Sequence, residues 1–398
     1  MKNLRVWRGP PVSHKPPPIA FLRYQNYHLA TSNPIEAVAR NMKRILIVST
    51  EKHSGKSLLS LALGRSLLER GMSIAYMKPI SFEVSYTTGE PIDRDAEALR
   101  SLLSLEDDLH DIAPVPLEGP FLREAIESGD RGFRTRITSA FDRIAAGRDA
   151  VIIEGRNYLG LGASAGLSDL DLAAFLDADV LLLTGYDGEE AIDRIICALR
   201  LFEEGPRILG VIINNVPMDR SYNLVSEVLV SFLASRGAEV LGIVPQDNNM
   251  RSVGTHEVAR RLGGQILTDE DVEQEVRHFV IGAMGIDSSL RSFRRTPELA
   301  VITGGDRAEI QTAALEVPSL RCLILTGSHR PPREIIDKAN QREIPVILAG
   351  QNTMLTATLC EGMLDRSWIR PGASLDYAVD YVRFNVDIDR MLEKATDH

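Results

Sequence analysis

The sequence is poor in cysteine and has no long apolar run. Its three cysteines, Cys197, Cys322 and Cys360, lie far apart and form no C-x-x-C pair, so we expect buried, inert thiols in a reducing compartment. No apolar run approaches the roughly 20 residues that cross a bilayer. We therefore expect a cytoplasmic protein that does not bind membranes.

Positive charge is also scarce. Lys and Arg number 45 against 55 Asp and Glu, and the formal net charge of −10 argues against a general nucleic-acid binder. Residues 1–41 are the exception, with six Lys/Arg, six prolines and one acid, Glu36. Their proline clusters disfavour a helix or a central strand, and they lack the apolar core of a secretory signal. We expect a disordered or non-native tail, with a functional arm as the alternative.

The rest of the chain has the apolar patterning of an α/β protein, and 44% of all residues are hydrophobic. An apolar run at 43–50 predicts a buried strand, helical spacing follows up to Gly71, and a second strand is expected at 72–80. This strand–helix–strand unit is typical of a doubly wound, mostly parallel sheet. Further strands are expected at 148–155, 178–186, 207–217 and 238–247. We predict a first domain over residues 42–267.

A second, smaller α/β domain is predicted over residues 281–398. The acidic segment 268–280 between the two is expected to be a solvated linker or a helix start. Asp306 and Glu309 have the spacing of a capping box for the helix that follows them.

The segment STEKHSGKS, residues 49–57, lacks the first glycine of the usual phosphate-binding loop, G-x-x-x-x-G-K-[ST], because Thr50 stands in its place. Its second half is intact as Gly55, Lys56 and Ser57. A phosphate site needs backbone N–H groups at a helix N-terminus, a lysine for the β- and γ-phosphates and a hydroxyl for Mg²⁺. The strand–loop–helix context supplies all three, so we predict a nucleotide site. A plain strand–helix turn is the alternative.

Acidic residues stand where a magnesium ion beside such a loop would need them. Glu154 ends the buried strand VIIEG, and Asp93 and Asp95 follow a loop rich in Gly and Pro. The alternatives are a solvent-facing strand end for Glu154 and helix caps for the two aspartates.

Two further strands end in polar side chains. Lys78 closes the second strand and can hold an anionic substrate or a transferring phosphate. Asn214 or Asn215 closes the strand GVIINN, where an amide can read the edge of an adenine. A solvated lysine and a turn-forming asparagine before Pro217 are the alternatives.

This ordered set of motifs resembles the dethiobiotin synthetase-like branch of P-loop proteins. That branch includes cobyrinic acid amidotransferase-type synthetases and the N-terminal domain of long phosphotransacetylases. The motifs are the loop ending G-K-S, the K-P after the second strand, the E-G strand end and GVIINNVP, within residues 42–265. In dethiobiotin synthetases the loop is one residue longer, G-x-x-x-x-x-G-K-T, so Ser49 falls in the place of the glycine.

The resemblance implies ATP and Mg²⁺ as cofactors. It implies that Ser57, Asp95 and Glu154 ligate the metal and that Lys78 is the catalytic residue that holds substrate and phosphate. The nucleotide-binding residues that it implies are Ser49, Ser54, Gly55, Lys56, Ser57 and Asn214. Two stretches depart from the dethiobiotin enzymes: residues 80–82 replace the part that grips the diamine, and residues 156–158 replace a Gly-rich loop. These departures argue against dethiobiotin synthesis.

The second domain resembles the DRTGG domain. The resemblance rests on Thr303 and the four residues after it, with the strands LILTG and IPVILAG. It implies a regulatory or assembly role, in which the candidate residues are Gly304, Gly305, Asp306 and Arg307. The alternative is a tight turn whose glycines permit positive φ and whose Asp306 caps the next helix.

Two functions follow from these motifs. The first is an ATP-binding regulatory or sensor protein, homodimeric, which passes its nucleotide state to the DRTGG domain and to a metabolic enzyme partner. The second is an ATP-dependent ligase or synthetase that phosphorylates a carboxylate or carbamate, and Lys78 supports it. A third interpretation keeps only the fold, with a loop that binds nothing. A phosphotransacetylase catalytic domain would need roughly another 300 residues, so acetyl transfer is not expected of this polypeptide.

Overall fold

The computed structural model describes residues 42–81, 84–85, 91–117, 132–247, 252–269, 271–364 and 373–395. The predictions for residues 1–41 lie outside these ranges. None of the helices within them is long and apolar enough to cross a membrane.

The first sheet has six strands, all parallel, in the order β10-β9-β8-β1-β7-β2. Its strands are apolar along most of their length because helices cover both faces. Since all of them are parallel, their carboxyl ends meet at one edge of the sheet. The bounds are β1 Lys43–Ser49, β2 Ile74–Met77, β7 Ala150–Glu154, β8 Asp179–Gly185, β9 Ile208–Val216 and β10 Val240–Pro245.

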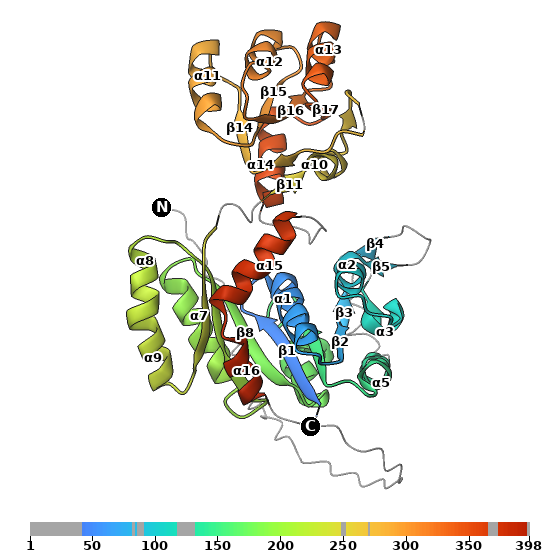
Figure 1. Ribbon diagram of the computed structural model, residues 1–398, viewed down its shortest axis with the longest axis vertical. Helices are drawn as coiled ribbons and strands as arrows, with labels where there is room; N and C mark the ends of the chain where they lie inside the picture. Colours follow the sequence, from blue (N-terminus) through green and yellow to red (C-terminus); the bar gives the residue numbers. More distant parts are fainter. Residues whose placement is uncertain are drawn as a thin grey trace, which may run out of the picture. The chain divides into compact units, whose positions relative to one another are not determined.

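Alternate side chains of β1 enter two separate cores, one on each face of this sheet. Leu46 and Val48 pack on the side of α5, α6 and α7, whereas Ile45 and Ile47 pack on the side of α1 and α2. The predicted doubly wound α/β fold is therefore confirmed (Figure 1).

The helices along the first sheet are α1 Lys56–Glu69, α2 Arg94–Leu102, α3 Leu109–Ile112, α5 Phe133–Ala145, η1 Ala163–Ala165, α6 Asp169–Phe175, α7 Glu189–Leu201, α8 Arg220–Asn223, η2 Leu224–Leu229 and α9 Val230–Ser235.

The second sheet has the order β12-β17-β16-β15-β14, and all neighbours are parallel except β12 and β17. Its strands are β12 Gln265–Ile266, β14 His278–Ile281, β15 Leu299–Gly304, β16 Leu320–Thr326 and β17 Val346–Leu348. Its helices are α10 Thr255–Leu262, α11 Ile286–Arg295, α12 Ala308–Ala314, α13 Arg333–Gln341 and α14 Thr353–Leu364. The predicted domain boundaries stay a prediction; β12, which lies within the first predicted range, pairs in this second sheet.

Three two-stranded ladders complete the described strands. They are β3 Ile80–Ser81 with β6 Val115–Pro116, β4 Val84–Ser85 with β5 Ile92–Asp93, and β11 Val253–Gly254 with β13 Glu275–Val276.

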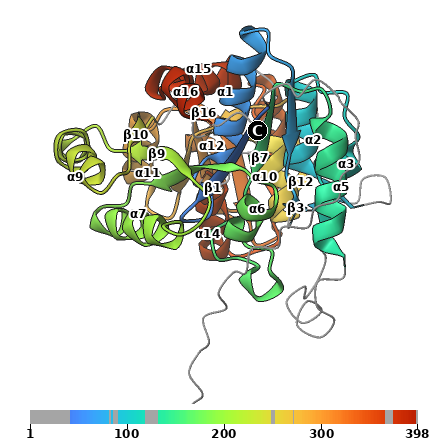
Figure 2. The same cartoon turned by 90° about the horizontal axis from the view of Figure 1, so that it is seen from below.

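The helices α15 (Ala373–Asn385) and α16 (Ile388–Lys394) pack against the first domain although they follow the second sheet in the chain. Val379 and Met391 join the core that contains α1, and α15 lies beside α1 (Figures 1 and 2). Arg65 of α1 pairs with Asp376 at 2.6 Å between Nη1 and Oδ1. The first domain is thus built from two separate segments of the chain.

Three local predictions differ from the structure. Cys197 is exposed on α7, whereas Cys322 and Cys360 are buried as expected. The N-cap of α12 is Arg307 and no side chain caps this helix, so Asp306 is not its cap. The segment 268–280 contains β13 and most of β14 rather than a helix start, because its apolar residues pair with neighbouring strands.

Candidate nucleotide site

The loop between β1 and α1 is shaped by one glycine and one asparagine. Gly55 has a φ of 101°, a conformation that favours glycine. Asn214, at the carboxyl end of β9, donates from Nδ2 to the carbonyl oxygen of Ser54 at 2.7 Å. A β-carbon at Gly55 would lie 2.8 Å from that same Nδ2 atom. Asn214 therefore supports the loop itself, and its predicted role at an adenine stays a prediction.

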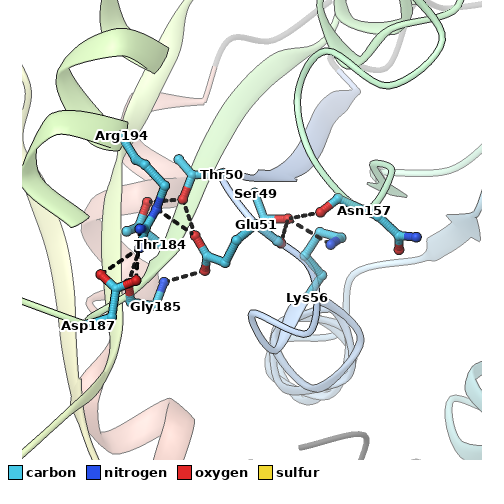
Figure 3. A network of polar contacts seen from close by, with 9 residues as sticks. All are labelled: Ser49, Thr50, Glu51, Lys56, Asn157, Thr184, Gly185, Asp187 and Arg194. Atoms are coloured by element: carbon cyan, nitrogen blue, oxygen red, sulfur yellow. Dashed lines mark hydrogen bonds and ion pairs between the residues drawn. The ribbon is translucent and has the colours of Figure 1, made fainter. Parts of the chain in front are cut away.

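Lys56 is turned into the loop. Its side chain is buried, and Nζ donates to the hydroxyl of Ser49 at 2.8 Å (Figure 3). That hydroxyl in turn donates to the carbonyl oxygen of Glu51 at 2.9 Å. Burial lowers the pKa of Lys56, and the nearby Glu154 opposes this shift. Ser49 thus does more than replace a glycine, because its side chain holds the loop lysine.

Glu154 is the acidic centre of the site. It is 4% exposed, and it accepts hydrogen bonds from the hydroxyls of Ser57 and Tyr76, each at 2.9 Å. Burial raises its pKa, while Lys78 and Lys56 lower it. The solvent-facing alternative for Glu154 is wrong, since the carboxylate lies inside the domain beside the first turn of α1.

Lys78 lies between two carboxylates. Its Nζ is 3.0 Å from Oδ2 of Asp93 and 2.9 Å from Oδ2 of Asp95. Burial alone would lower the pKa of Lys78, but Asp93 and Asp95 outweigh burial and raise it. Asp93 also accepts from the backbone N–H of Ala96 and so caps α2, whereas Asp95 lies in the first turn of that helix. The solvated-lysine alternative is wrong, and the predicted catalytic and metal roles stay predictions.

A second network of polar contacts connects the loop to β8 (Figure 3). The sequence motifs did not predict it. The Oε1 atom of Glu51 accepts a hydrogen bond from the backbone N–H of Gly185 at 2.6 Å. The Oε2 atom of Glu51 lies 3.4 Å from Nε of Arg194 in α7. Thr50 and Thr184 share a hydrogen bond of 3.0 Å. No motif signals these contacts, because the partners lie more than 130 residues apart.

Asp169 is a further residue near the loop that the motifs did not identify. It is fully buried at the start of α6, and its Oδ1 accepts from the backbone N–H of Arg156 at 2.8 Å. Its Oδ2 has no hydrogen-bond partner among the described residues. Burial raises its pKa to about 7, although Lys56 lies close enough to oppose this. The structure therefore brings a protonatable carboxyl beside the loop.

The regulatory candidates of the second domain connect neighbouring strand ends. A β-carbon at Gly305 would lie 1.9 Å from the carbonyl oxygen of His329, so this glycine is needed for close approach rather than for positive φ. Gly304 also lacks a positive φ. Arg307 donates to the carbonyl oxygen of Ala283 at 3.1 Å. The part of the tight-turn alternative that invoked positive φ is wrong.

The chain matches two protein families in succession. Residues 43–253 match a family described as an AAA domain, and residues 257–363 match the DRTGG domain. The phosphate acetyltransferase of Pseudomonas putida is 25% identical over 363 residues, a match that covers 87% of this chain and 51% of that enzyme. The chain spans about half the length of the curated phosphate acetyltransferases that it matches.

Two further similarities each cover about half of the chain. An ATP-dependent dethiobiotin synthetase of Methanococcus vannielii is 25% identical over 203 residues, covering 50% of this chain and 92% of that protein. The septum site-determining protein MinD of Pyrococcus horikoshii, solved with Mg-ADP, aligns with 53% of this chain and 84% of its own at 18% identity and a TM-score of 0.34. The AAA-domain match covers more than half of the chain, and the protein therefore belongs to this family of P-loop proteins and carries a DRTGG domain.

Proposed function

We propose that this protein is a regulatory protein that binds ATP and Mg²⁺ at its phosphate loop and transmits the nucleotide state to its DRTGG domain. The observation that carries the proposal is the placement of Lys56 and Ser57 at the first turn of α1, with Glu154 behind them. A helix N-terminus attracts phosphate, and a buried lysine there supplies the compensating charge.

The side chains fit a magnesium ion held mainly by its nucleotide. Mg²⁺ prefers oxygen ligands and usually retains several waters. Ser57 and Glu154 present a hydroxyl and a carboxylate oxygen 2.9 Å apart. The described residues contain no group of three or more His, Cys, Asp or Glu that could hold a metal alone. Phosphate oxygens and waters would thus complete the coordination, and Asp95 would first have to leave Lys78.

The coupling part of the proposal rests on α15. This helix follows the DRTGG domain in the chain and packs along α1, whose first turn carries Lys56 and Ser57. A shift of α1 on nucleotide binding would therefore act directly on the segment that leaves the DRTGG domain. Arg65 and Glu69 of α1 both form ion pairs with α15, through Asp376 and Arg383.

The ligase alternative receives less support. It requires the Lys78 ammonium to meet an anionic substrate, but in this structure Asp93 and Asp95 both pair with it. The proposal therefore assigns no reaction to the protein. It does include a cytoplasmic homodimer with a metabolic enzyme as partner, because the DRTGG resemblance implies assembly and the relatives that match are metabolic enzymes.

Calorimetric titration with ATP in the presence of Mg²⁺ tests the binding step. We expect saturable binding to the unmodified protein and at least a roughly tenfold weakening in Lys56→Ala, since a hydrogen bond to a charged group contributes about 1.5–3 kcal/mol. Lys338→Ala, which removes a surface lysine paired with Glu316, is the charge-matched control and should bind as the unmodified protein does. An unmodified protein that does not bind ATP would overturn the proposal.

Hydrogen exchange with and without ATP tests the coupling step. We expect ATP to change protection in α15 and in residues 257–363 as well as in α1. Protection that changes only in the first domain would separate nucleotide binding from regulation and contradict the coupling.

A further inference from the structure

A pocket of about 250 Å³ is lined by Asp93, which pairs with Lys78, and its lining includes no residue of the phosphate loop. It is formed by β3, β5, α2, α3 and β6, with the residues next to them. A larger hollow of about 550 Å³ shares three lining residues with it, Pro91, His110 and Pro116. The polar side chains that line the smaller pocket are Ser81, Asp93, Arg100, Asp108 and His110.

Arg100 is the cation of this pocket, and it forms no ion pair with the described residues. It sits in the last turn of α2 and is partly buried. Among the described residues its guanidinium has no hydrogen-bond or ion-pair partner, and its Nε is fully buried. By contrast, the neighbouring Arg143 is paired with Asp111 at 2.6 Å. An anion in the pocket would give the buried Nε the hydrogen-bond partner that it lacks.

Ser81 supplies a second unused group. Its side chain is fully buried at the end of β3, and its hydroxyl has no partner in the described part of the chain. Most buried hydroxyls are hydrogen-bonded, so an exception that lines a pocket points to a ligand. Arg100 and Ser81 thus offer a fork of N–H donors and one O–H donor to the same space.

The remaining lining selects among anions. Asp93 and Asp108 bring two carboxylates, and Asp93 shares Lys78 with Asp95. A phosphate, which is close to doubly charged at neutral pH, would be repelled more strongly here than a singly charged carboxylate. A carboxylate also matches the planar fork of a guanidinium. Apolar walls from Ile92, Leu109 and Ala113 suit a short carbon chain.

We propose that this pocket binds a small organic carboxylate, with its charged end on Arg100 and Ser81 and its carbon chain on the apolar wall. The site is separate from the phosphate loop and does not depend on nucleotide binding. Asp93 lines the pocket and also pairs with Lys78, so an occupant would act on this ion pair.

Calorimetric titration of the full chain with propionate, succinate and inorganic phosphate tests the proposal. We expect saturable binding of propionate or succinate that is tighter than that of phosphate, with at least a roughly tenfold loss in Arg100→Gln and a smaller loss in Ser81→Ala. Arg143→Gln, which removes a guanidinium that is already paired, is the matched control and should bind normally.

Three results would overturn the proposal. They are the failure of both carboxylates to bind the unmodified protein, equal binding by Arg100→Gln, and loss of carboxylate binding in Lys56→Ala. The last result would place these anions on the phosphate loop. ATP binding by Arg100→Gln, measured in the same way, shows that this variant is folded and keeps a failure here distinct from a failure of the nucleotide proposal.

Discussion

The two main sheets have the same strand arrangement at their carboxyl edges, but the side chains at the two edges differ. Each presents the carboxyl ends of parallel strands at one edge, the usual position of ligand sites in such folds. At the first edge lie the buried ionisable side chains of Lys56, Glu154 and Asp169. At the second edge Thr303, Thr326 and Gln311 are buried and neutral, and Arg307 bonds to backbone carbonyl oxygens.

The difference teaches that two sheet edges of the same topology can carry different chemistry. Charges that are costly to bury mark the first edge as a place where a charged ligand can repay the cost. Hydrogen bonds from Gln311 to the carbonyl oxygens of Gly304 and Gly305 tie the second edge together instead. Substitutions at each edge should therefore have distinct effects on stability and on ATP binding.

Lys78→Met should have the largest effect. It leaves the buried Asp93 without its counter-charge, and removing one partner of a buried pair costs about 3–5 kcal/mol. Denaturant unfolding should show this loss, and the second change Asp93→Asn should restore part of it. Arg307→Met at the second edge is the comparison and should cost less than about 1 kcal/mol. Equal losses at the two edges would remove the distinction between them.

Asp169→Asn should change how stability depends on pH. An ordinary Asp ionises near 3.8, but burial holds the pKa of Asp169 at about 7 in the folded chain. Between these values the folded state binds more protons than the unfolded state, so this group lowers stability as pH rises from about 4 to about 7. The full change is on the order of 2–4 kcal/mol. Unfolding free energies measured across this range should fall less steeply in Asp169→Asn, and parallel curves would contradict the assignment.

Gly305→Ala should destabilise the second edge alone. Its β-carbon would meet the carbonyl oxygen of His329, and forcing atoms into a packed site typically costs about 1–3 kcal/mol. Gly285→Ala is the matched control, because nothing lies within 4 Å of the added carbon. Thermal unfolding should separate the two variants, while both keep the ATP affinity of the unmodified protein. Weaker ATP binding in Gly305→Ala would instead link the edges.

Ser49→Gly should have the smallest effect and should act on ligand affinity. Removing the hydroxyl frees Lys56 from a hydrogen bond whose net contribution is about 0.5–1.5 kcal/mol. We expect ATP to bind a few-fold more tightly in calorimetry. Ser49→Ala separates the loss of the hydroxyl from the gain in backbone freedom. Weaker binding in both variants would show that the hydroxyl supports the binding conformation.

The sequence predicts what depends on local pattern. Apolar runs indicate the strands of the first sheet, and G-K-S after β1 indicates the loop, because each signal lies within a few neighbouring residues. The contact of Arg194 with Glu51 and the placement of α15 on α1 depend on residues far apart in the chain. Burial is also a property of the folded state, so nothing local distinguishes Asp169, with its raised pKa, from an ordinary acidic residue at the start of a helix.

The packing of α15 on α1, and of α16 on β9 and β10, has a consequence for synthesis on the ribosome. Domains generally fold as they emerge, beginning from the N-terminal side. The first domain cannot complete its core in this way, because Val379 and Met391 belong to that core and are translated only after the DRTGG domain. Until then the face of α1 that α15 covers stays exposed to solvent.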